Sequence, residues 1–189
     1  MLAMRVLFAM VLLLPQAAEP RRHQLDLEPL LHDAAALQKL TIMYTPPAQK
    51  AWHQAFFVRG DGSLTLQAYP NRPMSMTDIP TCREKVSLDK VRDLVRLIIQ
   101  RHFFDLPEKH FIFLFAAQGG EELELHTIAI DDGTGKASRT FGIGKYAGKD
   151  ESIPPDFASI EEQLKQLRDS AFPPGEKTCH FAPIIKFWN

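Results

Sequence analysis

The sequence predicts an α+β protein, in which an antiparallel sheet is formed from two strand meanders and helices pack on one of its faces. Alternating apolar and polar residues flank the turn at 60–62, and a second such pair of runs flanks the turn at 131–135. Alternating runs around an Asp-Gly turn are a strong hairpin signal. An amphipathic helix is predicted after each meander, whereas a parallel sheet would need a helix between successive strands.

The first half begins with a predicted helix at 27–38, where apolar residues recur at helical spacing. A β-like stretch follows at 40–44, and the first hairpin is expected to pair 52–59 with 64–69. Residues 70–86 are rich in proline and are expected to form a loop.

The most regular helical pattern follows Ser87, whose hydroxyl is suited to capping the free N–H groups of a first turn. Apolar residues then recur at i, i+3 and i+7 along one side, and charged residues occupy the other. The helix is expected to end near 102–104, before Pro107.

The second half is predicted to contain a buried strand at 111–117, strands at 122–130 and 136–143, and a last helix. The apolar phase changes within the second of these strands, which predicts a β-bulge near His126 and Thr127. The last helix is marked by Phe157, Ile160, Leu164 and Leu167, and the tail at 183–188 is a candidate edge strand.

Corresponding elements of the two halves recur at nearly equal offsets, which suggests an internal β-β-β-α duplication with pseudo-repeats at 38–106 and 108–172. The halves have negligible sequence identity, so element spacing alone supports this hypothesis. Both halves are expected to belong to one domain, 19–189, because that length suits a single core.

The N-terminus has the pattern of a secretory signal peptide, predicted to span residues 1–18. Arg5 precedes the apolar run 6–14, which is too short to span a bilayer, and small residues follow it. We therefore expect a secreted or periplasmic protein with no membrane span in the mature chain. The whole chain has a net charge of −1, which does not predict nucleic acid as a partner.

Cys82 and Cys179 are the two cysteines, and in an oxidising compartment such a pair predicts a disulfide. The bridge would stabilise the fold by about 4–5 kcal/mol in the chain-entropy model, because it closes a long loop. A catalytic thiol at Cys179, next to His180, is the less favoured alternative.

No motif for a nucleotide, a metal or a catalytic nucleophile is complete. The two Gly-Lys pairs lack the upstream glycine and the following Ser or Thr of a phosphate-binding loop, and no histidine pair has the spacing of a zinc-binding helix. We therefore expect no cofactor and no metal. If a site exists, its first candidates are His53 and His126 on predicted strands, together with Asp131 in the second turn.

Four features of the middle of the chain resemble a group of uncharacterised domains in predicted secreted bacterial proteins. They are the hairpin 57–66, the Ser-capped helix closing at 102–106, the hairpin 123–141, and the helix after Pro154-Pro155. The resemblance covers residues 38–171. It implies an α+β fold and export, and it implies no chemistry.

The sequence favours a non-enzymatic, exported binding module for an unknown protein or small-molecule ligand. Its contact surface is expected on the exposed sheet face or on the Met- and Pro-rich loop 70–86. One alternative is a secreted hydrolase or metal-dependent enzyme, whose site would bring two or more of His53, His126, Asp131 and Cys179 together. A structural component of the cell envelope is the other.

Overall fold

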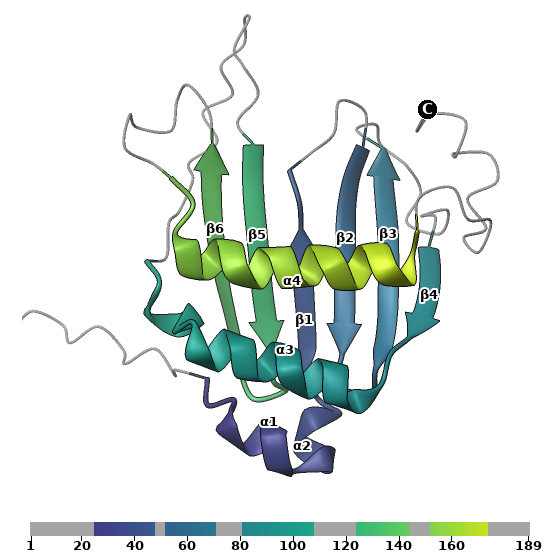
Figure 1. The fold of residues 1–189 in the computed structure, drawn as a ribbon, viewed down its shortest axis with the longest axis vertical. Helices are drawn as coiled ribbons and strands as arrows, with labels where there is room; N and C mark the ends of the chain where they lie inside the picture. The colour runs from purple at the N-terminus through teal and green to yellow at the C-terminus, as the bar shows by residue number, and fades with distance from the viewer. Residues whose placement is uncertain (1–24, 48–51, 71–80, 108–123, 144–151, 174–189) are drawn as a thin grey trace, which may run out of the picture.

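The protein is described here from a computed structural model that covers residues 25–47, 52–70, 81–107, 124–143 and 152–173. A six-stranded antiparallel sheet has two long helices on one face, and two short helices lie at one end of it (Figure 1). This arrangement confirms the predicted fold class. The predicted signal peptide at 1–18, the strand at 111–117 and the edge strand at 183–188 lie outside the described residues.

The sheet has the order β4-β3-β2-β1-β5-β6, and every neighbouring pair is antiparallel. Its strands are β1 (Thr41–Thr45), β2 (Trp52–Arg59), β3 (Ser63–Pro70), β4 (Thr81–Lys85), β5 (Glu124–Asp131) and β6 (Lys136–Ile143). Both predicted hairpins are therefore present, as β2–β3 and β5–β6. The short strand β1 pairs with both of them and joins the two halves of the chain into one sheet.

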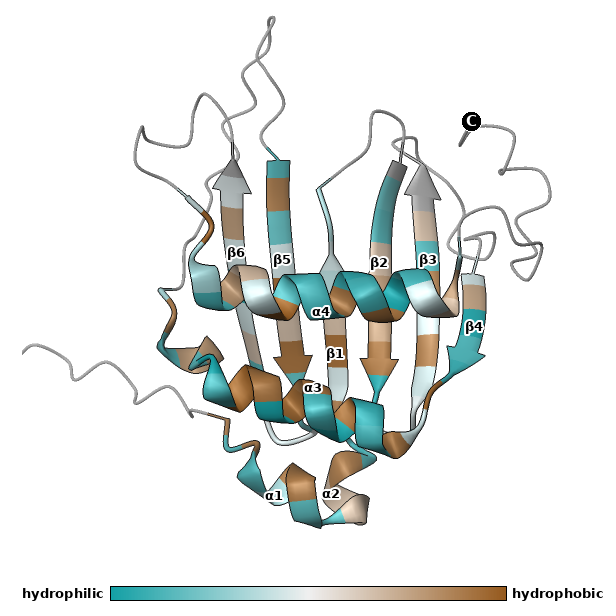
Figure 2. Ribbon diagram, viewed as in Figure 1, coloured by the Kyte–Doolittle hydropathy of each residue, from teal (hydrophilic) through white to brown (hydrophobic). Residues whose placement is uncertain are grey.

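Two long helices, α3 (Leu88–Gln100) and α4 (Pro155–Ala171), cross the strands on the same face and run in opposite directions (Figure 1). The Ser87 side chain accepts a hydrogen bond from the backbone N–H of Lys90, as its position predicts. Apolar segments alternate with polar ones along both helices (Figure 2), and the apolar residues Val91, Leu94, Ile98, Phe157 and Leu164 are buried in the core. The side chains buried between the layers include Ile42, Phe56, Val58, Leu64, Leu94, Ile98, Ile128, Ile130, Phe157, Ile160 and Leu164.

The predicted N-terminal helix at 27–38 is instead two short helices, α1 (Glu28–His32) and α2 (Ala34–Leu37). Asp33 interrupts them in an extended conformation, with φ −103° and ψ 111°. Its carboxylate accepts the N–H of Ala35 and so caps the second helix at its start. A local side-chain hydrogen bond of this kind competes with helix continuation, which the apolar spacing does not reveal.

The predicted loop at 70–86 is wrong at its C-terminal end, where β4 forms the edge of the sheet. Three of its five residues are exposed, so the strand lacks the apolar alternation that sequence patterns detect. Pairing with β3 supplies its backbone hydrogen bonds, and its charged side chains suit an edge strand.

The predicted bulge near His126 and Thr127 is absent, because β5 and β6 pair without a register break from Glu124 to Asp131. The phase change has another cause. His126 occupies the inward position that an apolar residue would normally hold, in phase with Ile128 and Ile130. A buried histidine therefore continues the regular strand.

The predicted disulfide and the predicted duplication each involve residues outside the described part of the chain. Cys82 lies on β4 with 3% of its surface exposed and packs in the core cluster, whereas Cys179 lies outside the described residues. The disulfide stays a prediction. The duplication also stays a prediction, because the strand expected to begin the second repeat, at 111–117, is not described.

Gly60 marks the place where the first hairpin touches the N-terminal helices. A Cβ atom built on Gly60 would lie 1.5 Å from the carbonyl oxygen of Leu37, which is a backbone atom and cannot rotate away. The Gly60 N–H also donates to the carbonyl of Leu40 over 2.9 Å, which holds the two backbones together. Only glycine permits this approach.

We predict that Gly60→Ala lowers the free energy of unfolding by about 3 kcal/mol, because one backbone segment must move away from the other. Gly135→Ala is the matched control, since its Cβ would meet only the end of the Leu25 side chain, at 2.9 Å. That variant should lose less than about 1 kcal/mol. Urea unfolding followed by circular dichroism measures both, and equal losses would contradict the close contact.

Candidate functional site: the open face of the sheet

The structure does not bring the three sequence-predicted site residues together. His53 on β2 and Asp131 on β5 lie on the face turned away from α3 and α4, because they are out of phase with the buried residues of their strands. They occupy opposite ends of that face, about 20 Å apart at the usual rise per residue. His126 faces the helices and is buried. Cys179 lies outside the described residues.

His126 belongs instead to a buried polar cluster that attaches α4 to the sheet. One carboxylate oxygen, Oε1 of Glu161 on α4, accepts the Tyr44 hydroxyl from β1 over 2.8 Å. The same oxygen lies 2.5 Å from Nδ1 of His126 on β5. Lys165, one turn further along α4, places its Nζ 3.3 Å from this oxygen. Tyr44, His126 and Glu161 are 0%, 6% and 3% exposed.

The negative charge in this cluster is on Glu161. Burial raises the pKa of its carboxyl, but the hydrogen bonds from His126 and Tyr44, together with nearby positive charge such as that of Lys165, outweigh burial and hold that pKa below its ordinary value of 4.5. Burial, followed by the hydrogen bond to the carboxylate, raises the pKa of Tyr44. The phenol therefore stays protonated and acts as a donor.

Sequence reasoning missed Glu161 and Tyr44. Glu161 follows Phe157 by one helical turn and precedes Leu164 by three residues, so it lies within the apolar stripe of α4. An acid in that stripe, together with a histidine in the inward phase of a strand, was the available signal. Their pairing depends on which strand lies beneath the helix, and the sequence does not state this.

The geometry around His126 limits what the cluster can do chemically. A carboxylate on Nδ1 orients an imidazole, as it does for catalytic bases and metal ligands. Nε2 of His126, however, is buried and has no hydrogen-bond partner among the described residues. In the described part of the chain, no three His, Cys, Asp or Glu side chains are grouped as metal ligands. The cluster as described fastens a helix rather than exposing a reactive atom.

Both long helices pack on one face of the sheet. Among the described elements, no helix covers the other face (Figure 1). Strand register places its side chains in rows across the sheet. The middle row runs Ser138, Ala129, Met43, Phe57, Thr65 and Arg83. Met43 and Phe57 are half-buried at its centre. This surface, which we call the open face, comprises the outward residues of β1 to β6.

Three exposed cations gather at one corner of the open face. Arg83 and Lys85 project from β4, and the register places Arg59 of β2 and Lys85 on either side of Ser63. Within the described residues, these three side chains make no hydrogen bond or ion pair. At the other end of the row of residues that contains Arg59 and Lys85, Lys136 pairs with Asp131 over 3.6 Å. Unbalanced positive charge is thus concentrated on β2 to β4.

Asp61 lies in the turn that adjoins this corner, whereas Glu84, between Arg83 and Lys85 on β4, is in phase with Leu64 and projects to the other face. The carboxylate of Asp61 accepts the backbone N–H and the hydroxyl of Ser63 over 2.8 and 2.9 Å. These bonds, and then the charges of Lys85 and Arg59, hold the pKa of Asp61 below its usual value. Among the described residues of this face, one acid adjoins the three cations, so their combined charge is positive. We refer to Arg59, Arg83 and Lys85 as the basic corner.

We predict that Glu161→Ala lowers the free energy of unfolding by about 3–5 kcal/mol, because it leaves the buried Tyr44 hydroxyl and His126 imidazole without their acceptor. Glu162→Ala is the matched control, since Glu162 is exposed and its carboxylate bonds only the Gln166 amide in the described structure. The control should change stability by less than about 0.5 kcal/mol. Urea unfolding measures both variants, and similar values would show that the cluster does not hold α4.

We also predict an acid sensitivity that depends on Glu161. Its folded pKa lies below the ordinary carboxyl value of 4.5, so the unfolded chain takes up the proton first as pH falls. The cluster's contribution is therefore complete above about pH 5 and is lost progressively below that value. Glu161→Gln should make the free energy of unfolding less dependent on pH there, whereas Glu162→Gln should retain the wild-type dependence. Identical slopes in urea titrations of the two variants would contradict this assignment.

Comparison with known proteins adds no further assignment. No protein-family model matches this chain, and no curated protein matches its sequence significantly. In the part of the chain that the structure describes, none of the helices has the length and apolar character needed to cross a bilayer. The resemblance to uncharacterised secreted domains stays an expectation, and function has to be argued from the geometry above.

Proposed function

We propose that this protein is a non-enzymatic binding module that docks an acidic protein surface on its open face. The observation that carries the proposal is the basic corner, with three exposed cations that have no ion-pair partner among the described residues and that lie beside the half-buried side chains of Met43 and Phe57. That the module is exported rests on the N-terminal sequence pattern alone.

The size and composition of the open face suit a protein partner. Four strands about 27 Å long and two about 17 Å long, spaced by about 4.8 Å, present roughly 700 Å², close to the 800 Å² that each partner contributes to a standard interface. Phe, Met and Arg are enriched at such interfaces, and small hydroxyl side chains allow close approach. Phe57 and Met43 supply an apolar centre, and half-buried threonines surround them at 41, 45, 127 and 140.

The charge of this face favours an acidic partner over a basic one. Positive side chains at the basic corner attract carboxylates and repel other cations, which accelerates association with acidic surfaces and selects against basic ones. Because the corner is exposed to solvent, this attraction weakens as salt screens it. Binding that depends on the corner is therefore expected to weaken with ionic strength.

An enzymatic function is the less favoured hypothesis. The feature that would support one is the carboxylate-oriented imidazole of His126, but its Nε2 atom is buried under α4 and faces away from His53 and Asp131. A substrate would have to displace the helix to reach it. Binding at the open face needs no such rearrangement.

The test is a comparison of capture profiles. The biotinylated chain, the variant Arg83→Glu/Lys85→Glu and the control Lys90→Glu/Arg96→Glu are incubated with envelope and medium fractions of the producing cells, and retained proteins are quantified by mass spectrometry. The control makes the same change of charge on α3, on the other side of the sheet.

We predict at least one acidic protein that the wild type and the control retain and that the Arg83/Lys85 variant loses about tenfold or more, since each lost ion pair in a desolvated contact costs on the order of 1 kcal/mol or more. Its retention should also fall between about 50 and 300 mM salt. Circular dichroism and urea unfolding verify that all three chains are folded. Capture profiles that do not differ between the wild type and the Arg83/Lys85 variant would overturn the proposal.

A further inference from the structure

The strand that carries two of the three cations of the basic corner is joined to the core by a single buried side chain. Among the described strands, β4 pairs with β3 alone. Of its five residues only Cys82 is buried, with 3% of its surface exposed, whereas Arg83, Glu84 and Lys85 are exposed. Cys82 belongs to the core cluster and therefore connects β4 to the interior.

The two ends of β4 are held differently. Its C-terminal end leads directly into α3, and the Val86 N–H donates to the Gly62 carbonyl over 2.9 Å. Its N-terminal end, where Cys82 lies, follows residues 71–80, which are outside the described part of the chain. A short edge strand opens locally from its less anchored end, so Cys82 and its neighbour Arg83 lie at the end that opens first.

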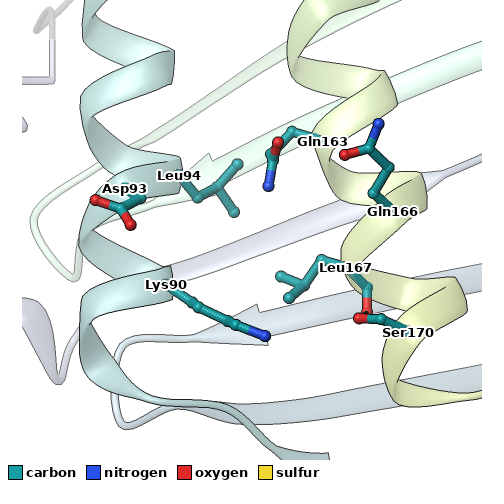
Figure 3. Close-up of a pocket in the computed structure, with 7 residues that line it drawn as sticks. All are labelled: Lys90, Asp93, Leu94, Gln163, Gln166, Leu167 and Ser170. Atoms are coloured by element: carbon teal, nitrogen blue, oxygen red, sulfur yellow. Dashed lines mark hydrogen bonds between the residues drawn. The ribbon is translucent and has the colours of Figure 1, made fainter.

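The C-terminal end of α4 is fixed close to this strand. Leu167 of α4 points toward Leu94 of α3 (Figure 3), and the two side chains are 6% and 1% exposed. Phe172, the residue after α4, packs edge-on against Phe56 of β2, with ring centroids 6.3 Å apart. This end of α4 lies over β3, next to β4 (Figure 1).

The length of chain after α4 is sufficient to bring Cys179 to Cys82. Strand register places Phe56, Leu66 and Cys82 in one row on the face that α4 covers. With strands about 4.8 Å apart, the Phe172 ring is roughly 16 Å or less from Cys82. The seven residues from Phe172 to Cys179 can span about 23 Å when extended. Chain length therefore permits a bridge with α4 and β4 in their observed positions.

We propose that a disulfide between Cys82 and Cys179 holds the N-terminal end of β4 in place and makes the basic corner respond to redox conditions. The bridge forms when a small-molecule or protein disulfide accepts two electrons and two protons from the two thiols and leaves as two thiols. Reduction restores the two thiols. Among the described elements, β4 is then held by its pairing with β3 and its link to α3. The regulation of binding rests on the proposed function, whereas the bridge and its effect on β4 do not.

The first measurement is the thiol content of the protein isolated from its producing cells without added reductant and denatured before alkylation. Neither cysteine should react. A digest of the monomer made without reductant should contain a peptide pair that joins residues 82 and 179, and mass spectrometry detects it. Alkylation of both cysteines would refute the bridge.

The second measurement is backbone hydrogen exchange of amides 81–85 in the oxidised wild type, the reduced wild type and the variant Cys179→Ala. This variant removes the bridge and leaves the buried Cys82 side chain in place. Relative to the amides of β1, those of β4 should exchange about tenfold faster in both bridge-free proteins, because β4 opens locally. The reference to β1 separates this opening from a general loss of stability.

Thr178→Ala is the matched control for the exchange measurement, because it changes the neighbouring residue and keeps both cysteines. It should behave like the oxidised wild type. A ratio of β4 to β1 exchange that is the same with and without the bridge would show that the bridge does not hold β4.

Partner capture tests the regulation. The acidic protein retained by the oxidised wild type and by Thr178→Ala should be retained about fivefold less by the reduced wild type and by Cys179→Ala, since binding must then order β4. Equal retention by oxidised and reduced protein would contradict the redox response. If none of the chains retains an acidic protein, the proposed function fails, and the thiol and exchange measurements still decide whether the bridge holds β4.

Discussion

One buried carboxylate determines how the two layers of this protein meet. Glu161 projects from the last helix into the core, where an isolated charge would be strongly destabilising. It is tolerated because donors reach it from β1, from β5 and from its own helix. These donors come from both halves of the chain. The cluster therefore requires the pairing of β1 with β5, and it favours one position of α4 on the sheet.

The same cluster depends on the register of the β1–β5 pair. Thr45 opposes Thr127 in the β1–β5 pair, which places Tyr44 and His126 on the helix-covered face near the same end of the sheet. A slip of one residue in β5 would turn His126 to the open face and bring Thr127 under the helix. Glu161 would then lose a donor while remaining buried. The polar cluster thus makes a shifted register less stable than it would be if apolar residues alone lay at these positions.

The features recognisable from sequence are those carried by local patterns. The β2–β3 hairpin, the Ser87 cap and the stripe of α4 follow from residue spacing, and the structure contains all three. Features that depend on distant partners were missed or misread. β4 forms a strand because it pairs with β3. The phase change at His126 was interpreted as a bulge because the partner of His126, Glu161, is far away in the sequence.

The basic corner raises the question of whether its cations merely protect a sheet edge. Charged residues on edge strands prevent pairing with other chains, and this accounts for Arg83 and Lys85 on β4. It does not account for Arg59, which lies two strands further in, on a strand paired on both sides. Edge protection also requires no apolar neighbours, yet Phe57 and Met43 lie next to these cations. An interior cation beside a half-buried aromatic side chain is what a contact surface needs, and the open face combines the two on the side that α4 leaves free.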